Sequence, residues 1–216
     1  MKIVVFGATG GSGRAIVRRA LAEGHDVTAF VRDASKLETA PGLTVVEGDV
    51  MQDADVARAI EEPDAVVVSL GNSQNAFALL LGARRTTPRN VCEVGTRHVL
   101  DAMKSPSPAP LIVVSAFGVG DTRQHLPWMF KLFYRLFLRE QIADKERQEA
   151  LVKASGADYV LVQPVALTDA AGRGDWFASS SGERRGQEIA RADLAVFIVA
   201  ELAQRRHCRQ TVTLSG

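Results

Sequence analysis

Cysteine, net charge and long apolar runs are all scarce in this sequence. The 216 residues include two cysteines, Cys92 and Cys208, which lie far apart and form neither a metal-binding spacing nor a disulfide framework. The formal net charge is +1, which provides no electrostatic basis for binding nucleic acid or an anionic membrane. No apolar run is long enough to cross a bilayer. We therefore expect a cytoplasmic protein with no nucleic-acid partner and no integral membrane segment.

A leader peptide and a metal site are also missing from the pattern. Met1 and Lys2 lead directly into the apolar run Ile3–Phe6, which is too short for the core of a signal peptide and indicates a first strand. The four histidines share no ligand spacing, so we expect no metal. Apolar residues make up 46% of the chain and charged residues 24%, as in an ordinary globular protein.

Strand-like and helix-like segments alternate along the chain. Expected strands cover Ile3–Phe6, Val27–Val31, Thr44–Val46, Ala65–Ser69, Leu111–Ser115, Tyr159–Val162 (ended by Pro164) and Thr211–Leu214. Expected helices cover Gly11–Ala22, Gln52–Ile60 with Asp53 as a cap, Pro88 to about Lys104, a long stretch between about Leu126 and Ser155, and Arg191–Gln204. This alternation predicts an α/β fold, a doubly wound parallel sheet with flanking helices, in a single domain over residues 1–216.

Three segments lie outside this alternation, at 71–87, 118–140 and 165–190. By analogy with other proteins of this type of fold, we expect these segments to form the substrate side of the domain. Within them, Leu126–Leu138 is unusually apolar and aromatic but too short to span a bilayer. We expect it to form a pocket wall or a subunit contact, in a monomer or a homodimer.

Glycines cluster where the first expected strand meets the first expected helix, in the segment GATGGSG that starts at Gly7. Gly7 lets the chain turn out of the strand, Gly10 lets the backbone approach a diphosphate, and Gly13 lets helix and strand pack closely. The free N–H groups at the helix N-terminus favour an anion. In this context the GxxGxxG spacing indicates a Rossmann-type domain that binds NAD(P). We also expect Thr9 of this loop to be among the cofactor-binding residues.

The ends of the second and third strands carry residues that select the cofactor. Arg32 and Lys36 follow the second strand, where cations accommodate a 2′-phosphate, whereas Asp33 beside them is the residue type that holds a free ribose 2′-hydroxyl. We favour NADP (NADPH), the alternative being that Arg32 and Lys36 form a solvated surface pair. Asp49 follows the third strand, where a carboxylate either accepts from the adenine amino group or forms a turn after glycine.

These segments together resemble the atypical short-chain dehydrogenase/reductases of the NAD(P)H-binding group, which include the biliverdin reductase B and flavin reductase branch and the more distant NmrA-like proteins. The resemblance covers essentially the whole chain. It rests on the motifs FGATGGSG from Phe6, VRD from Val31, GDV from Gly48, LGN from Leu70, GTR from Gly95, AMK from Ala102, SAF from Ser115 and SGADY from Ser155.

The resemblance implies a cofactor site assembled from the ends of successive strands. It assigns Gly10, Ser12 and Gly13 to the diphosphate, Arg32 and Lys36 to the 2′-phosphate, Asp49 and Val50 to the adenine, Leu70, Gly71 and Asn72 to the cofactor after the fourth strand, Ser115 to the nicotinamide, and Pro164 and Val165 to its flank.

The chain departs from the family at the expected catalytic pair. Most short-chain dehydrogenases use a Tyr-x-x-x-Lys pair, in which the tyrosine passes a proton to the substrate oxygen. Here the matching stretch has Gln141 and Lys145, and an amide does not titrate. Lys145 either orients the ribose or substrate or forms an i,i+4 ion pair with Glu149. Val165 also stands where relatives near biliverdin reductase B carry a histidine.

We therefore expect an NADPH-dependent oxidoreductase that transfers hydride to a small planar conjugated acceptor of the flavin, quinone or tetrapyrrole type. We expect Ser115 and Lys145 to be its catalytic residues, and the reduced acceptor to take its proton from water, so that catalysis is mostly orientation. The alternative is an NADP-sensing regulatory protein with little turnover, because such a protein needs the cofactor site but not the tyrosine. An isomerase or epimerase is disfavoured, since those enzymes usually retain the tyrosine.

Overall fold

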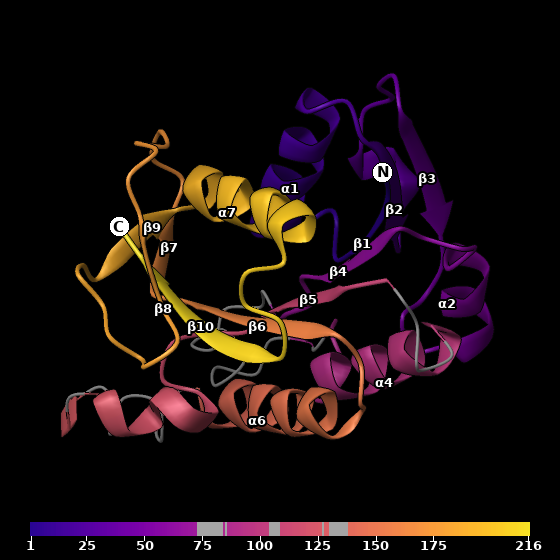
Figure 1. Ribbon diagram of the computed structural model, residues 1–216. Coiled ribbons are helices and arrows are strands. Elements are labelled where there is room, and N and C mark those ends of the chain that lie inside the picture. Colours follow the sequence, from indigo (N-terminus) through magenta and orange to yellow (C-terminus); the bar gives the residue numbers. More distant parts are fainter. Residues whose placement is uncertain (73–83, 85, 104–108, 127, 130–137) are drawn as a thin grey trace.

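The structure is a computed structural model, and it describes residues 1–72, 84, 86–103, 109–126, 128–129 and 138–216. Its centre is an eight-stranded sheet (Figure 1) in the order β3-β2-β1-β4-β5-β6-β10-β8. The strands are β1 (Lys2–Phe6), β2 (Asp26–Val31), β3 (Leu43–Glu47), β4 (Ala65–Val68), β5 (Leu111–Val114), β6 (Tyr159–Pro164), β8 (Phe177–Ser179) and β10 (Gln210–Ser215). Neighbouring strands run parallel except that β8 is antiparallel to β10 at the edge. The first six strands follow the Rossmann order, which confirms the predicted fold class.

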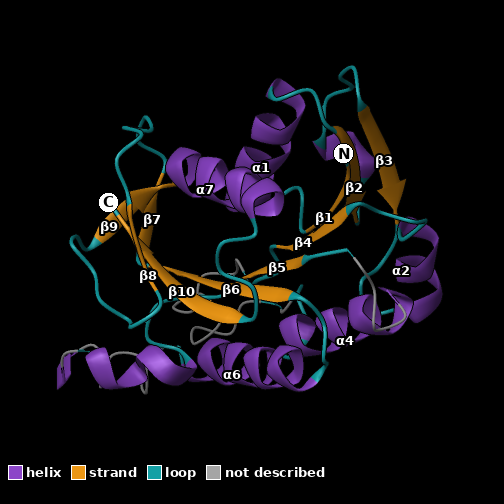
Figure 2. Ribbon diagram, in the orientation of Figure 1, coloured by secondary structure: helices purple, strands orange, loops and turns teal. Residues whose placement is uncertain are grey.

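Helices cover both faces of the sheet (Figures 1 and 2). One face carries α1 (Gly11–Ala22) and α7 (Arg191–Gln204), and the other carries α2 (Asp53–Ala59), α4 (Val91–Met103) and α6 (Arg139–Ala154). Side chains alternate between these faces along β1: Ile3 and Val5 join the apolar cluster under α1 and α7, whereas Val4 and Phe6 join the opposite cluster. Each central strand is therefore buried on both sides, as its uninterrupted apolar sequence predicts.

Several expected strand ends differ from the observed ones by one residue, and three further expectations about element ends were wrong. β6 does not end before Pro164 but includes it, because the last residue of a strand still offers its carbonyl, which accepts from Phe117 N at 2.9 Å. Asp53 is the first residue of α2 rather than its cap, and its carboxylate accepts locally from Ala54 N. Helix α4 begins at Val91 rather than at Pro88.

The region 165–190 is more regular than the expected loop. It contains β8 and a separate parallel pair, β7 (Ala166–Thr168) with β9 (Glu188–Ala190), near the end of β10 (Figure 2). Two short 3₁₀ helices, η1 (Ala34–Lys36) and η2 (Gly120–His125), follow β2 and β5. Much of the other two expected substrate-side segments, including most of Leu126–Leu138, lies outside the described residues.

No helix within the described ranges is long and apolar enough to cross a membrane.

Candidate cofactor and active site

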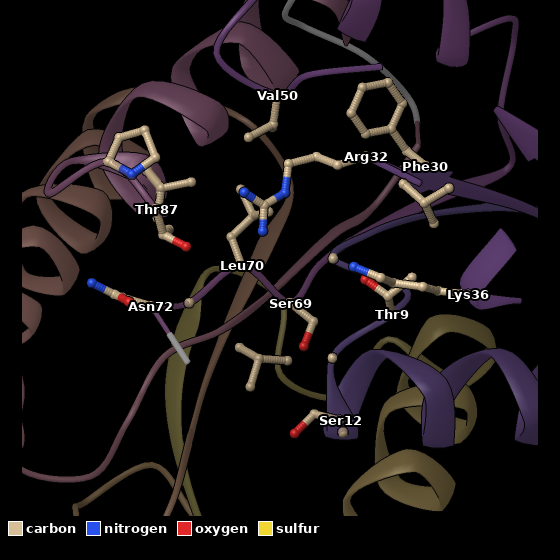
Figure 3. A pocket seen from close by; sticks show the side chains of 18 of the residues that line it. Thr9, Ser12, Phe30, Arg32, Lys36, Val50, Ser69, Leu70, Asn72 and Thr87 are labelled. Atoms are coloured by element: carbon tan, nitrogen blue, oxygen red, sulfur yellow. The ribbon is translucent and has the colours of Figure 1, made fainter. Parts of the chain in front are cut away.

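A cavity of about 760 Å³ opens at the carboxyl ends of the central strands, where the strand order reverses between β1 and β4 (Figure 3). Open α/β sheets bind ligands at this point because successive loops diverge there. The lining residues come from the ends of β1, β2, β4 and β5, from β7, from the segments after β3 and before α4, and from helices α1, α4, α6 and α7. They are Gly7, Thr9, Gly10, Gly11, Ser12, Phe30, Val31, Arg32, Lys36, Asp49, Val50, Ser69, Leu70, Gly71, Asn72, Thr86, Thr87, Pro88, Val91, Val114, Ser115, Lys145, Leu167 and Arg191.

The glycine loop is packed too closely for larger residues. Gly7 has φ +80°, and a Cβ atom there would lie 2.4 Å from the Ser69 carbonyl oxygen at the end of β4. A Cβ atom on Gly13 would lie 2.1 Å from the Gly7 carbonyl oxygen. Gly13 therefore brings α1 against the loop, as its spacing predicts, and does not itself line the cavity.

The start of α1 has the chemistry that a diphosphate requires. Gly10 is the N-cap and provides no side-chain cap hydrogen bond, and the first turn of the helix has no acidic residue. The N–H groups of this turn carry the positive end of the helix dipole. Arg191, at the start of α7, lies against Gly11, because a Cβ atom on Gly11 would come within 2.7 Å of its Nε. This part of the cavity fits the diphosphate of a dinucleotide.

The two cations predicted after β2 reach this same cavity, and the neighbouring acid does not. Arg32 donates from Nη1 to the Thr86 carbonyl at 3.2 Å and, with Lys36, lines the cavity (Figure 3). Asp33 instead caps η1, where its carboxylate accepts from Ser35 N at 3.1 Å and from Ser35 Oγ at 2.6 Å. These Ser35 hydrogen bonds and nearby Lys36 lower the pKa of Asp33.

Apolar and polar side chains meet at the end of the cavity near β2 and the segment after β3, where Arg32 lies between Phe30 and Val50 (Figure 3). Phe30 and Val50 line it together with Thr87 (Figure 3). Asp49 also lines it, while one carboxylate oxygen accepts from Met51 N at 3.0 Å. Asp49 thus forms the turn that was the alternative interpretation and still faces the cavity.

Lys145 joins the ends of two central strands. Its Nζ donates to the carbonyl of Leu70 at 2.8 Å, to the carbonyl of Val114 at 2.6 Å and to Gln148 Oε1 at 3.1 Å. These three acceptors match the three hydrogens of an ammonium group. Lys145 thus faces the cavity as a brace across β4 and β5, and the alternative of an i,i+4 ion pair with Glu149 is replaced by these contacts.

Ser115 lies at the end of β5 and lines the cavity, although its side chain is largely buried. Its hydroxyl donates to Glu149 Oε1 at 2.5 Å, and Gln163 Nε2 donates to the same oxygen at 2.7 Å. Burial raises the pKa of Glu149, while the hydrogen bonds from Ser115 and Gln163 oppose that rise. The sequence presented Glu149 only as a helix-surface partner for Lys145, so its role behind Ser115 was missed.

The structure brings most of the predicted site residues together around this cavity: Gly7, Thr9, Gly10, Ser12, Arg32, Lys36, Asp49, Val50, Leu70, Gly71, Asn72, Ser115 and Lys145. Gly13, Pro164 and Val165 are not among its lining residues, and neither is Gln141, which stands at the usual tyrosine position. Arg191 lines it but was not predicted, since an arginine at the start of a helix more than 150 positions from the glycine loop carries no local signal.

The fold and the cavity define the class: a Rossmann-type protein with a dinucleotide site at its topological switch point. A family model described as NAD(P)H-binding matches residues 7–205. The chain belongs to this NAD(P)H-binding family.

Comparisons with single proteins agree with this assignment. An uncharacterized chloroplastic protein of Arabidopsis thaliana is 31% identical over 175 residues, which cover 77% of this chain and 59% of that protein. The chain is also 26% identical to the reductase pytE of Aspergillus terreus, over 77% of this chain and 76% of that protein. The solved structure of ChuY, an anaerobillin reductase of Escherichia coli O157:H7, is 23% identical, with a TM-score of 0.79 over 100% of this chain and 97% of that one, and supports the fold.

Proposed function

We propose that the protein is an NADPH-dependent reductase that transfers hydride to a planar conjugated acceptor of the flavin, quinone or tetrapyrrole type. We further propose that residues 1–216 form one NAD(P)-binding domain and that 71–87, 118–140 and 165–190 contribute its substrate side. The family supports the nicotinamide cofactor, and the reductase name of the Aspergillus relative and the anaerobillin reductase name of the structural neighbour support the reaction class.

The observation that carries the NADPH preference is the divergence of neighbouring side chains after β2. Arg32 and Lys36 line the cavity, whereas Asp33 is not among its lining residues: one of its oxygens caps η1 and the other pairs with Lys36 at 3.5 Å. A carboxylate aimed at the ribose would repel a 2′-phosphate, and two cations attract it through charge-assisted hydrogen bonds. Arg14 supports this arrangement from α1, because its guanidinium donates to the Lys36 carbonyl at 3.2 Å.

We place the diphosphate over the start of α1, between the Gly10–Ser12 backbone and Arg191, whose guanidinium is held by Asp169 at 2.7 Å. The adenine then lies between Val50 and Asp49, and the nicotinamide reaches Ser115. When bound, the reduced cofactor supplies a hydride from its C4 position. The chain's part is to hold donor and acceptor face to face and to keep water from that contact.

The first prediction concerns cofactor choice. Arg32→Ala and Lys36→Ala should each weaken NADPH binding by about tenfold or more, since each removes one charged contact to the 2′-phosphate. Binding of NADH should stay within about twofold, because NADH lacks that phosphate. The measurement is titration of each variant with NADPH and NADH by quenching of Trp fluorescence or by calorimetry. Equal losses for the two cofactors, or no loss for NADPH, would contradict the assignment.

Turnover is tested on the same protein with NADPH and three probes: FMN, 1,4-naphthoquinone and biliverdin. Oxidation of NADPH, followed in its near-ultraviolet absorbance band, is expected with at least one of them. Binding of NADPH without turnover of any probe would reject the reductase and favour the NADP-sensing regulator, for which the amide at Gln141 already removes the usual proton donor.

A further inference from the structure

A buried polar cluster lies directly behind the cavity wall at Ser115. It joins the end of β5, β6, α6 and η2. Glu149 is 2% exposed, and its Oε1 accepts from both Ser115 Oγ and Gln163 Nε2. Gln163 is fully buried and is held by Thr122, whose hydroxyl donates to Gln163 Oε1 at 2.8 Å, and by the carbonyl of Val119 at 2.9 Å. The carboxyl is therefore fixed from the side opposite the cavity.

The second carboxyl oxygen of Glu149 is the unusual member of this cluster. Oε2 is buried and has no hydrogen-bond partner in the part of the chain that the structure describes. It lies against Gly120, where a Cβ atom would come within 2.4 Å of it. An ionised carboxylate spreads its charge over both oxygens, so a buried oxygen without a donor is costly. A neutral acid whose hydrogen lies on Oε1, in the 2.5 Å contact with Ser115 Oγ, leaves Oε2 as an uncharged carbonyl oxygen, for which a missing donor costs less. The geometry therefore favours a protonated Glu149.

The surrounding charges let this acid release its proton without leaving an isolated negative charge. The charged groups that face the carboxyl are Lys145 and Lys153 on its own helix, and Lys153 is paired with Asp121 of η2 at 2.5 Å. The contacts from the end of β5 and from β6 come from a hydroxyl and an amide, which do not titrate in the working range. Lys145, whose Nζ also braces the cavity wall, lowers the cost of an ionised Glu149.

We propose that Glu149 stores the proton that the reduction consumes and that Ser115 Oγ passes it into the cavity. This inference rests on the proposed reductase function. For a quinone, the ring receives a hydride from the reduced nicotinamide and one oxygen receives the proton of the Ser115 hydroxyl. In the protonated state the hydrogen of the 2.5 Å contact belongs to Glu149 Oε1, which donates it to Ser115 Oγ and leaves the Ser115 hydroxyl hydrogen free to reach the acceptor. As that hydrogen leaves, Ser115 takes the proton of Glu149 Oε1, and the resulting carboxylate accepts from Ser115 and Gln163. Solvent returns one proton to Glu149 before the next turnover, so one hydride and one proton are consumed.

This relay replaces the expectation that the acceptor takes its proton directly from water. It also accounts for the absence of tyrosine at position 141: the proton source has moved two helical turns along α6, from Gln141 to Glu149, on the same helix as Lys145. Because Glu149 acts through Ser115, it is a positioning residue and proton store, and Ser115 is the group that meets the acceptor.

The test compares the wild type with Glu149→Gln, which keeps an oxygen for the Ser115 hydroxyl but carries no acidic proton. Ser115→Ala interrupts the relay at its other end. Glu146→Gln is the matched control, since Glu146 lies on the same helix and pairs with Arg123 at the surface instead. For all four proteins, the NADPH dissociation constant is measured first, and it should be unchanged in Glu149→Gln. Infrared difference spectra then report the protonation state of Glu149, and kcat with the three probes is followed over pH.

We expect the wild type at neutral pH to show the C=O stretch of a carboxylic acid, shifted in D₂O and lost in Glu149→Gln. Its kcat should fall as pH rises through the Glu149 pKa, because the stored proton is then absent. Glu149→Gln and Ser115→Ala should each lower kcat by about 10²-fold, the usual size of a general-acid contribution, and the slow Glu149→Gln reaction should lose that pH dependence. Glu146→Gln should keep the wild-type profile.

Three results would overturn the relay. A carboxylate signal from Glu149 at neutral pH would do so whatever the turnover. A Glu149→Gln protein with wild-type kcat and pH profile would do so while leaving the reductase function in place. A wild type that binds NADPH but reduces none of the probes would overturn the reductase function and the relay with it.

Discussion

At the scale of single residues, charged side chains that are neighbours in the sequence have separate tasks. Arg32 and Asp33 are adjacent on the chain, but one lines the cavity and the other caps η1. Lys145 and Glu149 stand at i,i+4 spacing, which usually indicates an ion pair, and yet Lys145 binds backbone carbonyls of Leu70 and Val114 whereas Glu149 binds the Ser115 and Gln163 side chains. In both cases the contact partners come from elements distant in the sequence. The sequence showed which residues are charged, but it did not show which element each charged side chain contacts.

The two cysteines differ in their exposure to solvent. Cys92 is 2% exposed, and burial raises the pKa of its thiol to about 11. Cys208 is exposed, and both are free. The thiolate is the reactive form, so a buried thiol with a raised pKa is doubly protected.

We therefore predict that a disulfide reagent such as dithiobis(nitrobenzoate) labels Cys208 rapidly in the folded protein at about pH 8 and labels Cys92 only after unfolding. The measurement is the release of thionitrobenzoate with and without denaturant. Cys208→Ser is the control and should remove the fast phase. A fast phase that persists in this variant would show that Cys92 is accessible.

At the scale of elements, helix α6 holds the site together from outside the sheet. Its Asp144 is 2% exposed and accepts from the N–H groups of Cys92 at 2.9 Å and Glu93 at 3.0 Å. These are first-turn N–H groups of α4, so one helix caps another. This contact explains why α4 begins at Val91 instead of at Pro88, where the local sequence favours a helix start.

Asp144→Ala should lower the free energy of unfolding by about 2–4 kcal/mol, because it removes two charge-assisted hydrogen bonds and leaves one buried and one partly buried N–H donor unpaired. Urea unfolding followed by circular dichroism measures this change. Asp144→Asn keeps one acceptor oxygen and should lose less. Glu140→Ala on the same helix is the control: Glu140 is exposed and pairs with Arg89 at the surface, so its loss should be about 1 kcal/mol or less. A similar loss in the control and in Asp144→Ala would argue against the cap.

At the scale of the whole molecule, the cofactor site is a junction of segments that contact one another only through the fold. Among the described residues, the cavity takes its wall from the ends of four central strands and from α1, α4, α6 and α7, which lie on both faces of the sheet. A ligand bound there would contact the ends of β1, β2, β4 and β5 together. The unfolded chain has no such site, so the ligand would bind only the folded protein. Binding should therefore stabilise the entire fold through mass action.

At about 100 times its dissociation constant, NADPH should add about 2.7 kcal/mol to the free energy of unfolding. For a domain of this size that corresponds to a rise in Tm of about 5–10 °C. Differential scanning fluorimetry provides the measurement, with NADH at the same concentration as the comparison. The Arg32→Ala, Lys36→Ala double variant should give equal, small shifts with both cofactors. An equal large shift with NADH in the wild type would remove the basis for an NADPH preference.

The sequence by itself determined the class of fold and predicted the glycine loop that we propose as the diphosphate site. Apolar runs buried on both faces, the alternation of strand and helix periods, and the glycines at positions 7, 10 and 13 are local signals, because each depends on neighbours within one turn or one strand. The bounds of α1 and α7 agree with the prediction at both ends for this reason.

Tertiary structure alone decided which side chains meet inside the site. Asp33 caps η1 instead of lining the cavity. Three contacts join residues from different elements: Arg191 lies against Gly11, Asp144 caps α4, and Ser115 is hydrogen-bonded to Glu149. Each depends on strand order and on helix packing, which bring distant residues within a few ångströms. The glycine loop thus indicates the class of cofactor. The packing of α6 and α7 against the sheet determines which side chains lie beside the proposed cofactor site.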